Sequence, residues 1–247
     1  MTAEEIIARL IYRDGLMLVI DKPAGLAVHK GPKGGESLED YFDALRFGLP
    51  RPPALAHRLD RDTSGCLVLG RHRKALATLG RLFKSGRVGK SYWAVVAGGP
   101  TQDEGRIDLP LGRKDATRGW WMKHDPAGQP AATTWKVMGR TRDVAGRNDQ
   151  ASAAPGRMGI SWLALEPLTG RTHQLRVHCA AMGWPIIGDS VYGDAPRTGG
   201  PGLYLHAREV VVPLYNNRAP IRVTAPVPPH MQHLLRACGW SGESVAE

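Results

Sequence analysis

The sequence predicts an α+β fold, in which a mixed and mostly antiparallel β-sheet is flanked by helices and loops. Strand-like runs outnumber helical ones, and they do not alternate with helices in the regular order of βαβ units. Several runs also alternate apolar with polar residues, which is typical of antiparallel strands with one buried face. The chain has 247 residues, enough for a substantial core, and we expect a single domain over residues 1–247.

The strand-like segments are rich in branched and aromatic residues. In chain order they are 16-LMLVI-20, 66-CLVL-69, 91-SYWAVVA-97, 132-ATTWKVM-138, 160-ISWLALE-166, 203-LYLHA-207 and 209-EVVVP-213. Helices are expected over residues 37–45, 73–84, 172–182 and 229–237. Ser37 and Asp40 resemble a capping box, Gly86 follows the apolar stripe of the second helix, Gly183 stops the third, and Pro228 precedes the last.

The charge of the chain points to an anionic partner. There are 33 Lys and Arg residues against 23 Asp and Glu residues, a formal net charge of +10. Residues 51–90 alone contain ten basic and two acidic side chains. A nucleic acid or a membrane surface would match such a charge.

The cysteines and the apolar runs indicate the compartment. Cys66, Cys179 and Cys238 are too few and too scattered for a disulfide framework, and no pair has metal-ligand spacing. The N-terminal residues lack the pattern of a signal peptide, and no apolar run approaches the roughly 20 residues that span a bilayer. We therefore expect a cytoplasmic protein.

The stretch 57-HRLDRDTSG-65 places one carboxylate, Asp60, between Arg58 and Arg61 in the most basic part of the chain. Its Asp-Thr-Ser-Gly end is typical of a turn, and we expect that turn to lead into the strand at residues 66–69. Taken alone, the stretch fits two interpretations equally: a salt-bridged surface turn, or a functional carboxylate surrounded by cations.

The stretch 166-EPLTGRTHQLRVHCAAMG-183 leaves a strand and enters the third helix with Arg171, His173, Arg176 and His178. His173 and Arg176 are three residues apart and share a helix face. His173 and His178 are five apart, about 140° around a helix, whereas two ligands of one metal ion are four apart. We therefore expect no metal site, and we interpret His178 as a hydrogen-bonded structural residue.

Two aromatic stretches and one polar stretch leave alternatives open. Tyr92 and Trp93 face opposite sides of a strand, so one of them either stacks on an unstacked base or belongs to the core. The pair Trp120-Trp121 could stack on RNA or form an apolar hairpin tip. Residues 140–158 are polar and rich in Gly, Ala and Ser, which predicts a long exposed loop that either contacts RNA or is a tolerated insertion.

Together these stretches resemble a known family. HRLDRDTSG, KSYWAVVAG, GRTHQLRVH followed by PIIGDSVYG, and the N-terminal 21-DKPAGLAVH-29 are similar to the ordered motifs of the RluA-type pseudouridine synthases. The resemblance runs from about residue 15 to about residue 230. It implies the pseudouridine synthase fold, with a largely antiparallel sheet. Many relatives carry an additional N-terminal S4 domain, for which about 14 residues leave no room, so we expect a stand-alone catalytic domain.

The resemblance implies an isomerase that converts uridine in tRNA or ribosomal RNA to pseudouridine without metal or organic cofactor. By matching motif positions, Asp60 would be the catalytic aspartate and Arg58 would fill the space of the flipped nucleotide. Tyr92 would pack on the target base, and Arg176 would pair with Asp60. Arg61, Arg171 and His173 are further candidates for RNA binding. We expect a monomer that needs no protein partner.

The chemistry agrees with these roles. A carboxylate nucleophile in a site that excludes water must stay ionised, and an opposing arginine favours the charged form. A uridine must leave its stack before it can react, at a cost of a few kcal/mol that phosphate contacts offset. A non-catalytic RNA-binding protein of the same fold, of the ribosome-assembly type, is the alternative. A metal-dependent phosphodiesterase is disfavoured by the histidine spacing.

Overall fold

The computed structural model describes the whole chain except residues 32–33, 115–120, 143–158 and 244–247. It divides into two compact units. Unit 1 comprises Met1–Ser91 with His206–Pro226, and unit 2 comprises Tyr92–Leu205 with Val227–Glu247. The sheets are mixed and mostly antiparallel and the helices are few, as expected for the predicted α+β class. No helix of the described residues is long and apolar enough to cross a membrane.

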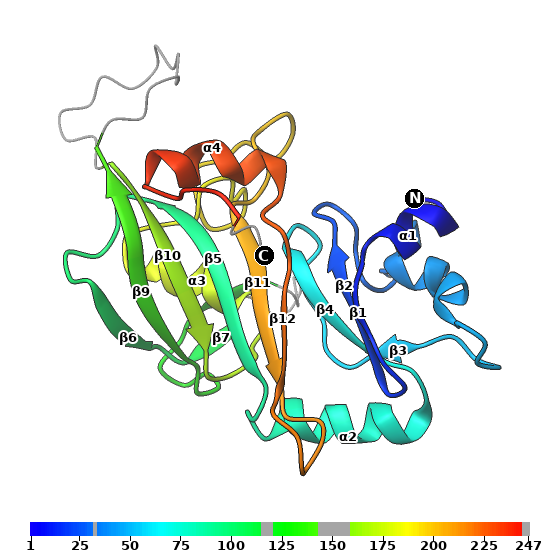
Figure 1. Cartoon of the computed structure of the whole chain (residues 1–247). Coiled ribbons are helices and arrows are strands. Elements are labelled where there is room, and N and C mark those ends of the chain that lie inside the picture. The colour runs from blue at the N-terminus through cyan, green and yellow to red at the C-terminus, as the bar shows by residue number, and fades with distance from the viewer. Residues whose placement is uncertain (32–33, 115–120, 143–158, 244–247) are drawn as a thin grey trace. The chain divides into compact units, whose positions relative to one another are not determined.

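Unit 1 is a sheet with one long helix packed on it (Figure 1). Its strands are β1 (Leu10–Arg13), β2 (Met17–Lys22), β3 (Ala54–Leu55), β4 (Ser64–Gly70), β11 (Leu205–Val212) and β12 (Ile221–Thr224), and its helices are α1 (Ala3–Ala8), the 3-10 helix η1 (Leu38–Leu45) and α2 (Arg73–Lys84). β2 and β3 both pair antiparallel with β4, β1 pairs with β2, and β12 pairs with β11.

The core of unit 1 lies between this sheet and α2. Leu79 and Leu82 of α2 are buried against Met17, Val68 and Val210 of three different strands. The predicted apolar stripe of residues 73–84 is therefore the face that packs. All seven residues of β4 are buried, so the strand that follows the Asp60 turn runs through the interior of the unit.

Unit 2 is an antiparallel sheet with α3 (Gln174–Ala181) and α4 (Pro229–Ala237) packed against it. Its strands are β5 (Gly89–Ala97), β6 (Glu104–Asp108), β9 (Ala132–Thr141) and β10 (Ile160–Pro167), in the order β5-β10-β9-β6, and β7 (Leu111–Arg113) pairs with β8 (Met122–His124) as a separate ribbon. Leu175 of α3 and Met231 of α4 are buried in the same core as Leu163 and Trp135.

The structure corrects several predicted bounds. The two segments 203–207 and 209–213 form one strand, β11, and the third helix begins at Gln174 instead of residue 172. Residues 37–45 form a 3-10 helix in place of an α-helix, with the Asp40 carboxylate accepting from the Ser37 amide as the capping pattern predicts. The short strands β1, β3, β6, β7, β8 and β12 and the helix α1 were not predicted.

The predicted loop 140–158 is wrong at its start. β9 continues to Thr141, so Arg140 lies on a strand, where its guanidinium pairs with Asp103 at 2.7 Å. Residues 143–158 lie outside the described residues, as does Trp120. Trp121 is described and directly precedes β8. The prediction that the chain is a single domain remains a prediction beside the two compact units.

Candidate active site

Asp60 lies on a turn that enters a buried strand, as predicted. The turn occupies the interval between β3 and β4, and the Thr63 amide donates to the Asp60 carbonyl at 3.2 Å. Asp60 is partly buried, whereas the neighbouring Arg58 and Arg61 are exposed. The backbone of the turn therefore positions a carboxylate at the boundary of unit 1 with solvent, with two cationic side chains beside it in sequence.

A fully buried lysine fixes this turn. Lys22, at the end of β2, donates from Nζ to the carbonyl of Pro23 at 2.7 Å and to the carbonyl of Arg61 at 2.8 Å. The Gly25 amide donates to the same Arg61 carbonyl, and Arg61 Nε donates back to the Gly25 carbonyl at 2.8 Å. Three hydrogen bonds thus join residues 22–25 to the residue that follows Asp60.

Burial lowers the pKa of Lys22 to about 8, while the carboxylates of Asp62, Asp60 and Asp21 act in the opposite direction. A buried ammonium group is tolerated only when its protons are bonded and its charge is balanced. Here the carbonyls of Pro23 and Arg61 accept hydrogen bonds from the ammonium group, and the acidic side chains balance its charge. Lys22 lies in the stretch 21-DKPAGLAVH-29, yet its role was not predicted from the sequence.

The far end of the turn is anchored by β11. Ser64 is buried and its hydroxyl lies 2.9 Å from Nδ1 of His206, which is also buried. Gly65 has φ +102°, and a Cβ at this position would lie 2.3 Å from the carbonyl oxygen of Ala207. Only glycine accommodates both the left-handed backbone and the approach of β11. The Ser-Gly pair of HRLDRDTSG is therefore structural.

His57 locks the beginning of the turn. Its Nε2 accepts from the Val68 amide at 3.0 Å, and its ring stacks on Phe83 with 4.4 Å between centroids. Burial, with Lys90 as a further cause, lowers the pKa of His57 to about 3. The imidazole is therefore neutral near pH 7 and serves as an acceptor, so it carries no charge to the candidate site.

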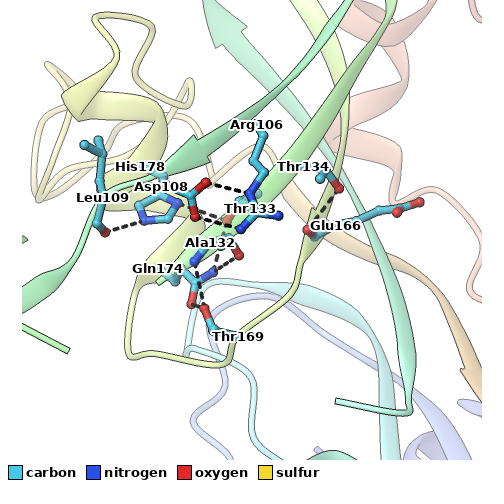
Figure 2. Close-up of polar contacts among 10 residues, drawn as sticks. All are labelled: Arg106, Asp108, Leu109, Ala132, Thr133, Thr134, Glu166, Thr169, Gln174 and His178. Carbon is cyan, nitrogen blue, oxygen red and sulfur yellow. Dashed lines mark hydrogen bonds and ion pairs between the residues drawn. The ribbon is translucent and has the colours of Figure 1, made fainter. Parts of the chain in front are cut away.

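In unit 2, α3 begins at an anchored turn. Gln174 is 4% exposed, and its Nε2 donates to the Ala132 carbonyl at 2.9 Å and to Thr133 Oγ1 at 3.0 Å. Its Oε1 accepts from Thr169 Oγ1 at 2.7 Å and from the Arg171 amide at 3.0 Å. Figure 2 shows these bonds between the start of α3 and β9. The amide of Gln174 thus ties the turn that bears Arg171 to the sheet.

His173 and His178 make separate contacts. His173 is the N-cap of α3 and has φ +53°, in the left-handed region, and its Nδ1 lies 2.8 Å from the Tyr192 hydroxyl. His178 has Nδ1 at 3.0 Å from Thr133 Oγ1 and Nε2 at 3.1 Å from the Leu109 carbonyl (Figure 2). Burial lowers the pKa of His178. The prediction that His178 is a hydrogen-bonded structural residue is confirmed.

Arg176 has a carboxylate partner that sequence reasoning missed. Its Nε and one terminal nitrogen donate to the two carboxylate oxygens of Asp189 at 2.7 and 2.8 Å, and both side chains are buried. Burial raises the pKa of Asp189, but the Arg176 bonds and the amides of Val191 and Tyr192 outweigh it, so the pKa is lowered. The Arg176 guanidinium also lies over the Tyr192 ring, 5.2 Å from its centroid.

Tyr192 contacts both His173 and Arg176. The expectation that these two residues share a helix face is wrong, because His173 precedes the first helical residue and has a left-handed backbone; Tyr192 links the two side chains instead. Arg171 is exposed, and its Nε donates to the Pro130 carbonyl at 3.1 Å. The signal for Asp189 was the motif PIIGDSVYG, but a spacing of 13 residues does not reveal an ion pair.

Tyr92 lies on β5 opposite Leu165 of β10 and is partly buried against the core of unit 2. Trp93 packs edge-on against Trp162, with 4.6 Å between centroids.

The predicted site residues thus fall into two sets. Asp60, Arg58 and Arg61 belong to unit 1, and Tyr92, Arg171, His173 and Arg176 belong to unit 2. The described residues contain no group of three or more His, Cys, Asp or Glu arranged to hold a metal ion.

Comparison with known proteins defines the class. The model of the RNA pseudouridylate synthase family matches residues 16–181. An uncharacterized RNA pseudouridine synthase of Zymomonas mobilis is 40% identical over 222 residues, which are 89% of this chain and 94% of the relative. One of Bacillus subtilis is 35% identical over 231 residues, 92% of this chain and 71% of the relative.

Solved structures agree with this class. The human RNA pseudouridylate synthase domain containing 4 has a TM-score of 0.75 at 25% identity, covering 96% of this chain and 95% of that chain. The human RNA pseudouridylate synthase domain containing 1 has a TM-score of 0.70 at 26% identity, covering 95% of both chains. The chain belongs to the RluA-type RNA pseudouridine synthase family. It is an isomerase that converts uridine in RNA to pseudouridine.

Proposed function

We propose that Asp60 is the nucleophile of this isomerase and that its substrate is a uridine of tRNA or ribosomal RNA that has rotated out of its stack. One observation carries the assignment of the nucleophile: a fully buried lysine and its neighbours fix the Asp60 turn by hydrogen bonds, within the residues that match the synthase family. A nucleophile needs a fixed position relative to the bond that it attacks. A solvated surface turn needs no such support.

The reaction balances without any external reactant. The N1–C1′ glycosidic bond breaks, the uracil rotates, and a C5–C1′ bond forms. The proton of C5 leaves, and N1 ends with a proton. Asp60 would supply the transient covalent partner, either at C1′ or on the ring. Tyr92 would pack against the base and assist removal of the C5 proton.

Arg176 is proposed to pair with Asp60 and keep it ionised. The bidentate bond of Arg176 to Asp189 fixes the plane of the guanidinium, which is a geometry suited to holding a second carboxylate. Arg58 is proposed to occupy the space of the flipped nucleotide. Arg61, Arg171 and His173 are proposed to contact the RNA around it, since phosphate contacts position an RNA without reading its sequence.

The assay is tritium release from RNA labelled at uracil C5. Total cellular tRNA and unmodified ribosomal RNA are tested in parallel with EDTA present. Release from either RNA is expected, because the C5 proton is lost when the new bond forms, and the RNA that responds defines the substrate class. Intact binding without release from either RNA would contradict the proposal and favour a non-catalytic RNA-binding protein.

A further inference from the structure

Two cations lie over one indole at the end of the ribbon formed by β7 and β8, Lys114 from the ribbon itself and Arg197 from the segment between α3 and β11. Lys114 Nζ lies 5.1 Å from the centroid of the Trp121 ring, and Arg197 Cζ lies 5.5 Å from it. Lys114 and Arg197 are both exposed, and Trp121 is half-buried. We call Lys114, Trp121 and Arg197 the hairpin cation site. The indole attracts both cations and so restricts their side chains before any ligand binds. They therefore lose less conformational entropy when they bind an anion.

The backbone of the ribbon holds this arrangement in place. The Lys114 amide donates to the Trp121 carbonyl at 2.7 Å, directly after the pairing of Arg113 with Met122. Leu111 is 1% exposed and packs with Ala131, so the base of the ribbon is anchored in a small core. Lys114 and Trp121 are therefore presented by an anchored ribbon, and Arg197 reaches the same indole from the segment between α3 and β11.

Tyr192 connects the ribbon to the helix that bears Arg176. Its hydroxyl accepts from the Met122 amide at 3.0 Å and lies 2.8 Å from His173 Nδ1. Its ring lies under the Arg176 guanidinium. Tyr192 thus joins the ribbon to Arg176, a proposed catalytic residue, and to His173, a proposed RNA contact. A ligand bound at the ribbon would lie within the same unit as Tyr92 and Arg176.

Two further exposed cations lie on the strands of the ribbon. They are Arg113 of β7 and Lys123 of β8. Asp125 lies 3.6 Å from Lys123 and balances that lysine only. Lys114, Arg197 and Arg113 add exposed positive charge beside the indole, and the substrate of the family is a polyanion.

We propose that the hairpin cation site binds the phosphate backbone of the RNA strand that flanks the target uridine. The inference rests on the proposed function, since it assigns part of the RNA-binding surface of the same enzyme. Lys114 supplies a point charge, and Arg197 supplies a planar fork that matches a phosphate. Trp121 supports both cations. The ribbon contributes to substrate affinity, while Asp60 and Arg176 contribute to the chemical step.

The test compares the double variant Lys114→Ala with Arg197→Ala against the wild type. Binding of fluorescent tRNA and ribosomal RNA transcripts is measured over a range of salt concentrations. The double variant should bind about tenfold more weakly, and the slope of log affinity against log salt should fall by about two, because two phosphate contacts are lost. The single-turnover rate at saturating RNA should stay unchanged.

A matched control is available on α4. Arg236 lies over Trp240 at 5.7 Å, which is the same kind of cation and aromatic pair, and α4 lies apart from β7 within unit 2 (Figure 1). Arg236→Ala should leave affinity and salt slope unchanged. A double variant with wild-type affinity and slope would overturn the proposal. The proposal would also be overturned if the wild-type protein bound poly-glutamate as tightly as RNA and the double variant did not, because the site would then fit an acidic protein.

The outcome is independent of the assignment of the nucleophile. The binding measurement needs no turnover, so it can succeed even when tritium release fails for wild type. Conversely, turnover by an Asp60→Asn variant would contradict the proposed chemistry and leave the binding result of the ribbon intact.

Discussion

Replacing Gln174 by leucine should destabilise the protein by about 2–3 kcal/mol. The substitution keeps the volume but removes four buried hydrogen bonds, to Ala132, Thr133, Thr169 and Arg171. At a net value of about 0.5–1.5 kcal/mol per bond, four bonds correspond to about 2–6 kcal/mol. The lower part of this range applies, because the Ala132 carbonyl and the Thr169 hydroxyl keep other partners.

Equilibrium unfolding in urea measures this loss, with Gln232→Leu as the control. Gln232 is a half-exposed glutamine of α4 whose Nε2 donates to the Val227 carbonyl and whose Oε1 accepts from the exposed Arg236, so its replacement should cost about 1 kcal/mol. The single-turnover rate of Gln174→Leu should fall while RNA affinity changes little, since the turn that begins α3 also positions His173 and Arg176. Equal destabilisation by the two variants would refute the anchoring role of Gln174.

The other predictions concern the two anchored segments. Lys22→Met should destabilise the protein by about 1–3 kcal/mol in the same urea experiment, because the carbonyls of Pro23 and Arg61 lose a buried donor; unchanged stability would contradict the anchoring role of Lys22. The pKa of His57 is about 3 in the folded state and 6.5 in the unfolded state. As the pH falls below 6.5 the unfolded state binds a proton that the folded state does not, so the contribution of His57 to folding stability is lost. The stability advantage of wild type over His57→Gln should therefore shrink by about 1 kcal/mol from pH 7 to pH 5.5, and a constant difference would refute the neutral imidazole. Arg176→Ala should cost about 3–5 kcal/mol by stranding Asp189, and Arg176→Lys should lower the single-turnover rate; an effect on RNA affinity alone would contradict the pairing with Asp60.

Local signals explain which elements were predictable. The bounds of α2 and α4 match the prediction because Gly86 is a strong stop signal for a helix, Pro228 is a strong start signal, and both helices carry an apolar stripe. β11 was divided in two because Arg208 interrupts its apolar run. That side chain reaches the Ala225 carbonyl, so a polar residue belongs within the strand. β6 was missed because Ile107 is its one buried residue, which leaves too little periodicity to recognise.

The site shows the same division. The order of the motifs was enough to locate the Asp60 turn and the start of α3. Lys22 and Asp189 could not be assigned, because their partners lie 39 and 13 residues away and are fixed by tertiary structure alone. When the sequence shows no partner for them, a lysine and an aspartate are predicted to be exposed charged residues. Both are buried, and both support residues of the proposed site.

The most direct test of the central claim compares Asp60→Asn with Asp62→Asn. Both variants remove one negative charge from the same turn, and Asp62 is exposed. Single-turnover formation of pseudouridine is measured on the RNA that wild type modifies, with RNA affinity measured in parallel. Asp60→Asn should bind RNA and form no pseudouridine, while Asp62→Asn should retain turnover. Turnover by Asp60→Asn at the wild-type rate would contradict the assignment of the nucleophile.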